Sequence, residues 1–409
     1  MKRAFNALRG LPRVVWLLGL ISLANDSASD MVYPLIPLYL TAVLMAGPRV
    51  LGLIEGLAEA GSSLLKLVFG VLADRHQRMR RWIGSGYAMS GIARPLIGLT
   101  TSWAGVLGCR LVDRIGKGVR SAPRDALLSL AVAPDQRGLA FGFHRAMDNA
   151  GAVVGPLVAA GLLAWGLSLR AIFLWSIVPA VLVIVLALRI REPEGRVPVK
   201  RTAFDWKFRR LPAGFRRYLV ALGLFTLGNS SNLFLLLRAE DMSVGAERIV
   251  LMWVLYSAVA MLLSTPLSAL SDRFGRIRVL GTAWAIYAIA YLVIGWLPQA
   301  GWALWLAFTL YGAVTAALEG TEKALVADLV DGERSGTAYG WYNLVAGIML
   351  LPASLIFGEL WQTWSAAMAF GFGAACAFVA TVLLWGWVNR AVPPSARQDG
   401  FAPQDALPR

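Results

Sequence analysis

Long apolar segments separated by short polar ones run through the 409-residue chain. A helix needs about 20 mostly apolar residues to cross the hydrocarbon core of a bilayer, and these segments are long enough. In lipid only helices and closed barrels satisfy their own backbone hydrogen bonds, and barrel strands would show weaker, alternating segments. The pattern therefore predicts an all-α integral membrane protein with 12 transmembrane helices, near residues 14–40, 50–72, 82–100, 103–131, 138–164, 168–190, 216–238, 248–271, 278–297, 302–330, 336–361 and 364–389.

Composition supports a membrane protein and argues against a nucleic-acid partner. Hydrophobic residues make up 57% of the chain and charged residues 15%, whereas soluble domains carry about 25% charged residues. The formal net charge of +15 sits in short segments between the apolar runs, as in cytoplasmic loops. The N-terminal apolar stretch continues past signal-peptide length, which predicts an uncleaved first span. We expect a multi-pass protein in the lipid bilayer of a bacterial inner (plasma) membrane, with both termini cytoplasmic.

Cysteine and histidine are too scarce for a metal centre. The chain has two cysteines, Cys109 and Cys376, and two histidines, His76 and His144. Their positions form no disulfide framework and no metal-ligand spacing. We expect no metal and no cofactor. No catalytic constellation is visible either, so we do not expect an enzyme.

A basic linker divides the chain. The longest polar segment, 189–217, holds ten Lys or Arg and three acidic residues. Six predicted helices precede it and six follow, so it returns to the cytoplasmic side, where basic segments belong. The predicted domains are an N-terminal six-helix half at 1–190, a cytoplasmic linker at 191–217, a C-terminal six-helix half at 218–390 and a disordered cytoplasmic tail at 391–409.

The two halves repeat one another. Asp74-Arg75 recurs 198 residues later as Asp272-Arg273, and the same offset links "AFGF" at Ala140 to "AYGW" at Ala338. A repeat of six helices in each half is characteristic of transporters that bind substrate between the halves. We therefore expect two pseudo-symmetric halves around a central cavity.

Three features resemble the major facilitator superfamily. The first is a loop signature after the second and eighth predicted helices. Its second copy fits the family pattern, whereas the first has His76-Gln77 where a Gly is usual. The resemblance implies that these loops form a latch that gates the cytoplasmic side, through Asp74, Arg75, Asp272, Arg273, Gly275 and Arg276.

The second feature is the spacing of small residues in the fifth helix, and the third is an arginine near the start of the fourth. Gly142, Gly151, Gly155 and Pro156 resemble the family's antiporter motif, although Ala159-Ala160 replaces its closing Gly-Gly. Small residues at this spacing also let two helices approach closely, which any helical bundle needs. Arg110 and Arg114 each match part of the family's arginine pattern. The stretches "NDSASDMVYPLIPLYL", "DRIGKGVRSAPRDAL" and "EGTEKALVADL" further resemble one bacterial subgroup.

Polar residues concentrate in the first, fourth, seventh and tenth helices, which line the cavity in the family. Charges within a membrane are costly and usually face a cavity or a partner. We expect Asp26 and Asp30 to face Arg110, Arg114 or Lys117 across the cavity. The alternative is that all these charges form structural ion pairs. The cavity candidates are Asn25, Arg110, Arg114, Lys117, Asn229, Asn232 and Lys323.

Acids within the spans are the candidates for proton coupling, because a carboxyl group in apolar surroundings binds a proton more readily than one in water. They are Asp26, Asp30, Glu319, Glu322 and, after these, Asp148. The resemblance implies a monomer that exports a small organic molecule in exchange for protons by alternating access. The alternatives are a proton symporter that imports an anionic metabolite and a lipid or lysolipid flippase.

Overall fold

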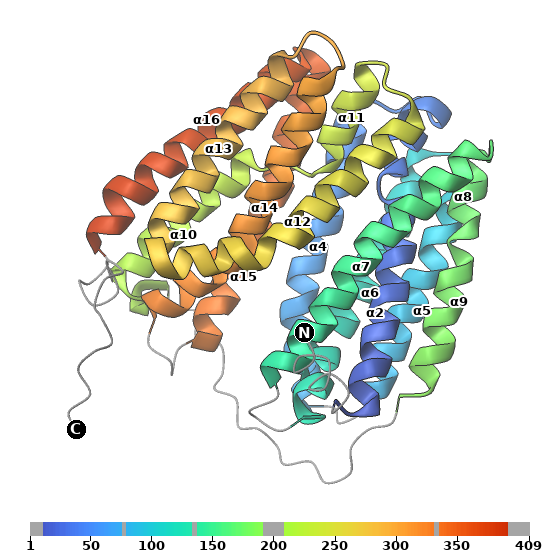
Figure 1. Cartoon of the computed structure of the whole chain (residues 1–409), viewed down its shortest axis with the longest axis horizontal. Helices are drawn as coiled ribbons and strands as arrows, with labels where there is room; N and C mark the ends of the chain where they lie inside the picture. The colour runs from blue at the N-terminus through green and yellow to red at the C-terminus, as the bar shows by residue number, and fades with distance from the viewer. Residues whose placement is uncertain (1–10, 76–78, 133–136, 191–207, 331–334, 392–409) are drawn as a thin grey trace.

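The computed structural model describes residues 11–75, 79–132, 137–190, 208–330 and 335–391, and every regular element within them is a helix (Figure 1). The predicted tail and most of the predicted linker lie outside these ranges. Within them, each predicted segment coincides with one helix or with consecutive helices. The prediction of an all-α fold is confirmed.

The helices before the linker match the first six predicted segments. The first segment is divided into α2, α3 and η1, and the sixth into α8 and α9. The bounds are α2 Arg13–Val32, α3 Leu35–Leu38, η1 Tyr39–Val43, α4 Pro48–Arg75, α5 Met79–Ile97, α6 Trp103–Leu130, α7 Arg137–Ala164, α8 Leu169–Trp175 and α9 Ile177–Leu188.

The helices after the linker match the other six segments. The seventh segment is divided into α10 and α11, and the twelfth ends in two short turns. The bounds are η3 Phe208–Arg210, α10 Ala213–Gly228, α11 Leu233–Asp241, α12 Ala246–Phe274, α13 Arg276–Trp296, α14 Trp302–Leu329, α15 Ser335–Thr363, α16 Ala366–Leu383, η5 Leu384–Val388 and η6 Asn389–Ala391.

Eight helical segments in the described part of the chain are long and apolar enough to cross a membrane. The other four predicted spans are α2 with its extension, α4, α5 and α6, which carry charged residues in their interiors. The count of 12 spans therefore stays a prediction. Whether these four helices can also cross a membrane depends on how their charged side chains are neutralised.

The first six segments gather on one side of Figure 1 and the last six on the other. The most extensive contacts between the sides are those of α4 with α15 and of α7 with α12. The turns at 44–47 and 242–245 lie at one end of the bundle, which we call the hairpin end. α9 ends and α10 begins at the opposite end, which we call the linker end (Figure 1).

Two glycines of the predicted antiporter motif lie where α7 packs against α2. A Cβ added to Gly151 would lie 2.6 Å from the carbonyl oxygen of Leu23, and one added to Gly155 would lie 2.8 Å from the amide nitrogen of Met31. A Cβ added to Gly142 would meet nothing within 4 Å. Gly151 and Gly155 therefore lie where α7 closely approaches α2, whereas Gly142 has open space beside it.

Replacing Gly155 by Ala should destabilise the protein by about 1–3 kcal/mol, because the added methyl group must displace the backbone of α2. The matched control is Gly142→Ala, which adds the same group in open space and should be neutral or slightly stabilising. Thermal unfolding of the purified variants in detergent measures both. Equal effects at the two positions would contradict the packing explanation.

Candidate functional site

A buried network of ion pairs joins α4, α5 and α6. Arg110 on α6 donates to Glu55 on α4, with 2.6 Å between Nη2 and Oε1. On the other side, Arg94 on α5 donates to Asp113 on α6 at 3.0 Å. Asp113 also lies 3.6 Å from Arg110, which links the two pairs. All four side chains are at least 95% buried.

The network extends to α2 and to a third arginine. Arg94 also donates to the side-chain oxygen of Asn25 on α2 at 3.1 Å. Arg114 lies one turn beyond Arg110 and pairs with Glu59 at 2.7 Å, one turn beyond Glu55. Three arginines thus face three carboxylates within the membrane, and such balance is needed because an unpaired buried charge is strongly destabilising.

The network gives Arg110 and Arg114 partners other than Asp26 and Asp30. We expected Asp26 and Asp30 to face Arg110, Arg114 or Lys117, with structural ion pairs as the alternative. The carboxylate partners of the two arginines are Glu55 and Glu59. The sequence contained a signal for this pairing. The two acids are four residues apart on α4, and the two arginines are four residues apart on α6. When the two helices lie side by side, each acid can therefore pair with one arginine.

A second group of polar residues lies toward the helices of the other half. Asp26 accepts a hydrogen bond from Asn25 at 2.7 Å and interacts electrostatically with Lys117. Asp30 interacts with the same lysine and with Tyr256 on α12. Of the three cations predicted to face these two acids, the structure places Lys117 there.

The seventh predicted segment breaks where its asparagines lie. α10 ends at Gly228 and α11 begins at Leu233, with Asn229 at φ −92° and ψ 78°. Interrupted helices mark binding sites in transporters, since the unwound backbone offers polar groups at membrane depth. Asn232 accepts from the hydroxyl of Tyr311 at 2.6 Å and lies 3.4 Å from that of Tyr256.

Aromatic side chains surround this break, and the sequence analysis missed them. Tyr287 donates to the side-chain oxygen of Asn229 at 3.3 Å and stacks on Tyr291, with 4.2 Å between the ring centroids. Trp253 stacks on Tyr256 at 4.6 Å, and its ring lies 5.2 Å from that of Tyr33, the residue after α2. Tyr287 and Tyr291 are one turn apart on α13. A count of charged and amide residues in each span does not include them, because tyrosine is grouped with the apolar residues.

One hydrogen bond ties the break to the ion-pair network. Ser231 donates to Glu55 across the two halves, with 3.3 Å between the oxygen atoms. The second oxygen of the same carboxylate is thus held by the break between α10 and α11, while the first is held by Arg110. Glu55 on α4 therefore connects α6 to a segment of the other half that is far away in the sequence.

The remaining candidate acids lie apart from the arginine network. Asp148 on α7 accepts from Ser22 and lies 3.5 Å from Nδ1 of the buried His144. Glu322 on α14 accepts from Tyr342 at 2.6 Å, while its neighbour Lys323 has an exposed side chain. The side chain of Glu319 lies outside the described residues.

The gating residues are only partly described. The side chains of Asp74, Arg75 and Asp272 lie outside the described residues. Gly275 joins α12 to α13 with φ 91°, a backbone angle that favours glycine. Arg276 forms an ion pair with Asp328 of α14, within its own half. The latch itself stays a prediction.

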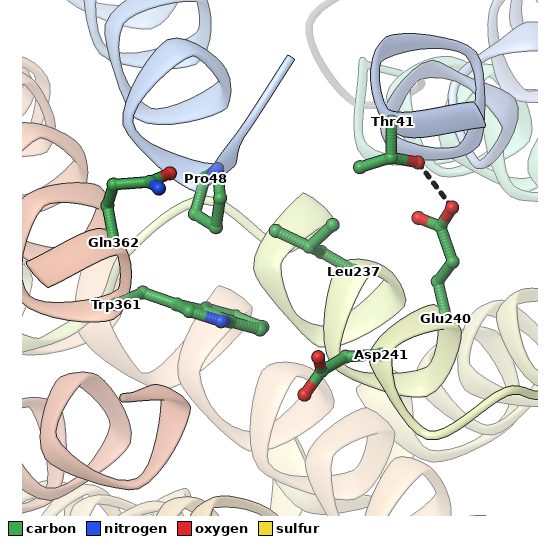
Figure 2. Close-up of a pocket in the computed structure, with 7 residues that line it drawn as sticks. All are labelled: Thr41, Pro48, Leu237, Glu240, Asp241, Trp361 and Gln362. Carbon is green, nitrogen blue, oxygen red and sulfur yellow. Dashed lines mark hydrogen bonds between the residues drawn. The ribbon is translucent and has the colours of Figure 1, made fainter. Parts of the chain in front are cut away.

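Polar contacts join the two halves at the hairpin end. Arg49 at the start of α4 pairs with Glu359 of α15 at 2.6 Å. Figure 2 shows Thr41 donating to Glu240 of α11 beside a pocket of about 430 Å³. The pocket is lined by Thr41, Pro48, Leu237, Glu240, Asp241, Trp361 and Gln362. These contacts hold the hairpin ends of the two halves together.

Comparison with known proteins gives the family. The sequence profile of the Major Facilitator Superfamily matches residues 16–243 and again residues 218–408. The chain belongs to the Major Facilitator Superfamily. The resemblance predicted from its motifs is confirmed, and the protein is a multi-pass membrane transporter of this superfamily.

Relatives and solved structures agree with this assignment. An MFS-type transporter of Methanocaldococcus jannaschii is 33% identical over 383 residues, which cover 92% of this chain and 95% of that protein. The multidrug resistance protein MdtH of Photorhabdus laumondii is 23% identical over 320 residues, covering 76% of this chain and 78% of MdtH. A variant of the nucleoside transporter NupG shares the fold, with a TM-score of 0.77, 11% identity and coverage of 93% and 100%.

In this superfamily member, the Glu55–Arg110 pair should behave as one unit. Glu55→Leu leaves a buried arginine short of its partner and should cost about 3–5 kcal/mol. The double variant Glu55→Leu with Arg110→Met removes both charges and should be more stable than either single variant. Thermal unfolding in detergent gives the comparison.

The exposed pair at the hairpin end is the matched control. Arg49 and Glu359 keep 58% and 49% of their side chains exposed, so Glu359→Leu should cost about 0–1 kcal/mol. A double variant of the buried pair that is no more stable than its single variants would contradict mutual neutralisation.

Proposed function

We propose that this transporter exports a small organic solute in exchange for protons. The observation that carries the proposal is a series of neighbouring acids within the predicted spans that lie outside the arginine network. Asp148 interacts electrostatically with Asp26, and Asp26 with Asp30. Protonation of one of these acids therefore affects the next one electrostatically.

Six of the acids within the predicted spans fall into two classes. Glu55, Glu59 and Asp113 lie within ion-pair distance of an arginine, which fixes each of them as a carboxylate. Asp26 and Asp30 have no arginine at ion-pair distance among the described residues, and Asp148 pairs at that distance with His144. A group that couples transport to protons must exist in both forms, and only the second class meets this requirement.

The second class forms a path from the linker end into the bundle. Asp148 lies about 17 Å along α7 from its first residue, and Asp26 and Asp30 lie about 20 and 25 Å along α2, at 1.5 Å per residue. Both helices begin at the linker end. The glycine contacts keep them close, since a Cβ on Gly151 would lie 2.9 Å from the Cβ of Asp26.

The residues around Asp30 suit an organic solute that is neutral or positively charged. Arg110 and Arg114 are neutralised within their own network, which leaves Asp26, Asp30, Lys117 and Arg120 with a formal net charge of zero when all are ionised. Trp253, Tyr256 and Asn232 add aromatic faces and amide groups. Aromatic faces attract cations, and amides fix orientation by hydrogen bonds. The multidrug resistance relative is in keeping with such a solute.

Alternating access gives the acids their role. With the hairpin end held by the contacts of Thr41 and Arg49, Asp26 and Asp30 exchange protons and solute with the linker side. Binding of solute displaces a proton, and the reverse exchange occurs when the hairpin end opens. We place the linker end in the cytoplasm, because basic segments remain there.

Asp30→Asn should abolish proton-coupled transport and leave expression and thermal stability intact. Compounds that stabilise the purified protein differently at two pH values supply the test solutes. Each is added to everted membrane vesicles that hold an acid interior, and a pH-sensitive dye reports whether the gradient dissipates. Wild-type vesicles should lose the gradient, and Asp30→Asn vesicles should resemble vesicles without transporter.

Glu247→Gln is the matched control, because it neutralises an exposed acid at the hairpin end of α12. It should transport like the wild type. If the Asp30→Asn variant and the double variant Asp26→Asn with Asp30→Asn both dissipated the gradient like the wild type, the assignment of these acids would be refuted. A solute that acidifies the vesicles further would indicate symport.

A further inference from the structure

A second groove lies on the outer face of the C-terminal half, away from Asp26, Asp30 and Lys117. We call it the outer groove. It has a volume of about 470 Å³ and is formed by α12, α13 and α14. It is lined by Leu267, Leu270, Phe274, Arg278, Val279, Thr282, Ala283, Ile286, Leu310, Ala313, Val314 and Ala317.

The outer groove faces the lipid. Phe274 is 52% exposed, and Leu270, Ile286 and Leu310 are 38–40% exposed, although all four are apolar. These three helices are long and apolar enough to cross a membrane. In a bilayer the surface of such helices contacts acyl chains, so the groove is open to hydrocarbon.

The length of the groove fits one leaflet. It starts beside the turn at Gly275, at the linker end of α12 and α13. Arg278 and Ile286 mark its extent along α13, and they are about 12 Å apart at 1.5 Å per residue. Half of the hydrocarbon core is about 15 Å thick. The groove therefore runs from the membrane surface toward the bilayer centre.

Charge is confined to the surface end of the groove. Arg278 is the charged lining residue, and the exposed Arg273 lies at the same end. α13 also begins there, and its first turn has no side-chain cap, so its backbone N–H groups favour an anion. A guanidinium group binds a phosphate through paired hydrogen bonds. The rest of the lining is apolar apart from Thr282.

We propose that the outer groove binds an anionic phospholipid, with one acyl chain between α12, α13 and α14 and its phosphate on Arg278. Among the described residues, those that line the groove include no carboxylate and none of the residues around Asp30. The lipid is thus a resident ligand of the C-terminal half, and its binding does not depend on proton-coupled export.

Native mass spectrometry of the purified protein tests this proposal with two lipids of equal chain length, phosphatidylglycerol and phosphatidylcholine. The wild-type protein should retain phosphatidylglycerol preferentially. Arg278→Gln should weaken that binding about tenfold, as expected for loss of a charge-assisted hydrogen bond. Arg248→Gln removes an exposed arginine at the other end of α12 and should leave it unchanged.

A second pair of variants tests the acyl-chain site and leaves Arg278 in place. Thr282→Trp fills the groove from an exposed lining position and should displace the bound lipid. Ile289→Trp adds an indole to another exposed position of α13, outside the lining, and should retain it. Equal retention of the two lipids by the wild type, or unchanged phosphatidylglycerol binding in Arg278→Gln or Thr282→Trp, would overturn the proposal.

Discussion

A charge in the hydrocarbon core needs a partner in the same core, and this constraint organises the N-terminal half of the transporter. Arg94, Arg110 and Arg114 each have a carboxylate partner within 3.0 Å. The helices that carry these charges, α4, α5 and α6, are among those whose composition alone does not mark them as spans. Their ion pairs add to the packing between these helices, because separating the helices would expose unpaired ions to lipid.

The same constraint separates structural charges from those available for transport. An acid fixed by an arginine cannot change protonation without destabilising the bundle. Asp30 lies toward Trp253 and Tyr256, and Asp26 toward α7. Under the proposed function, a bound solute takes the place of a partner for these acids. Glu55 connects the two regions, since its carboxylate accepts from both Arg110 and Ser231.

The positions of the helices followed from the apolar segments, because helix length in a membrane is set by bilayer thickness. Pairing was harder to predict. The sequence left open which of Arg110, Arg114 and Lys117 faces Asp26 and Asp30, because spacing shows which side of a helix a residue is on, whereas its partner depends on how the neighbouring helices are rotated. The break at Asn229 lies in a run of small polar residues that hydropathy does not resolve. Tyr287 and Tyr311 were overlooked because their hydroxyls matter only once the rings converge.

The two ion pairs between α4 and α6 constrain how the sequence of this chain can diverge from those of its relatives. Glu55 and Glu59 meet Arg110 and Arg114 at the same interval, so a single substitution at any of these positions leaves an ion without its complement. A homologue that keeps a stable fold must then retain both residues of an ion pair or replace both. The four positions are therefore expected to vary as two linked pairs among homologues, and Asp26 and Asp30 to vary independently of them.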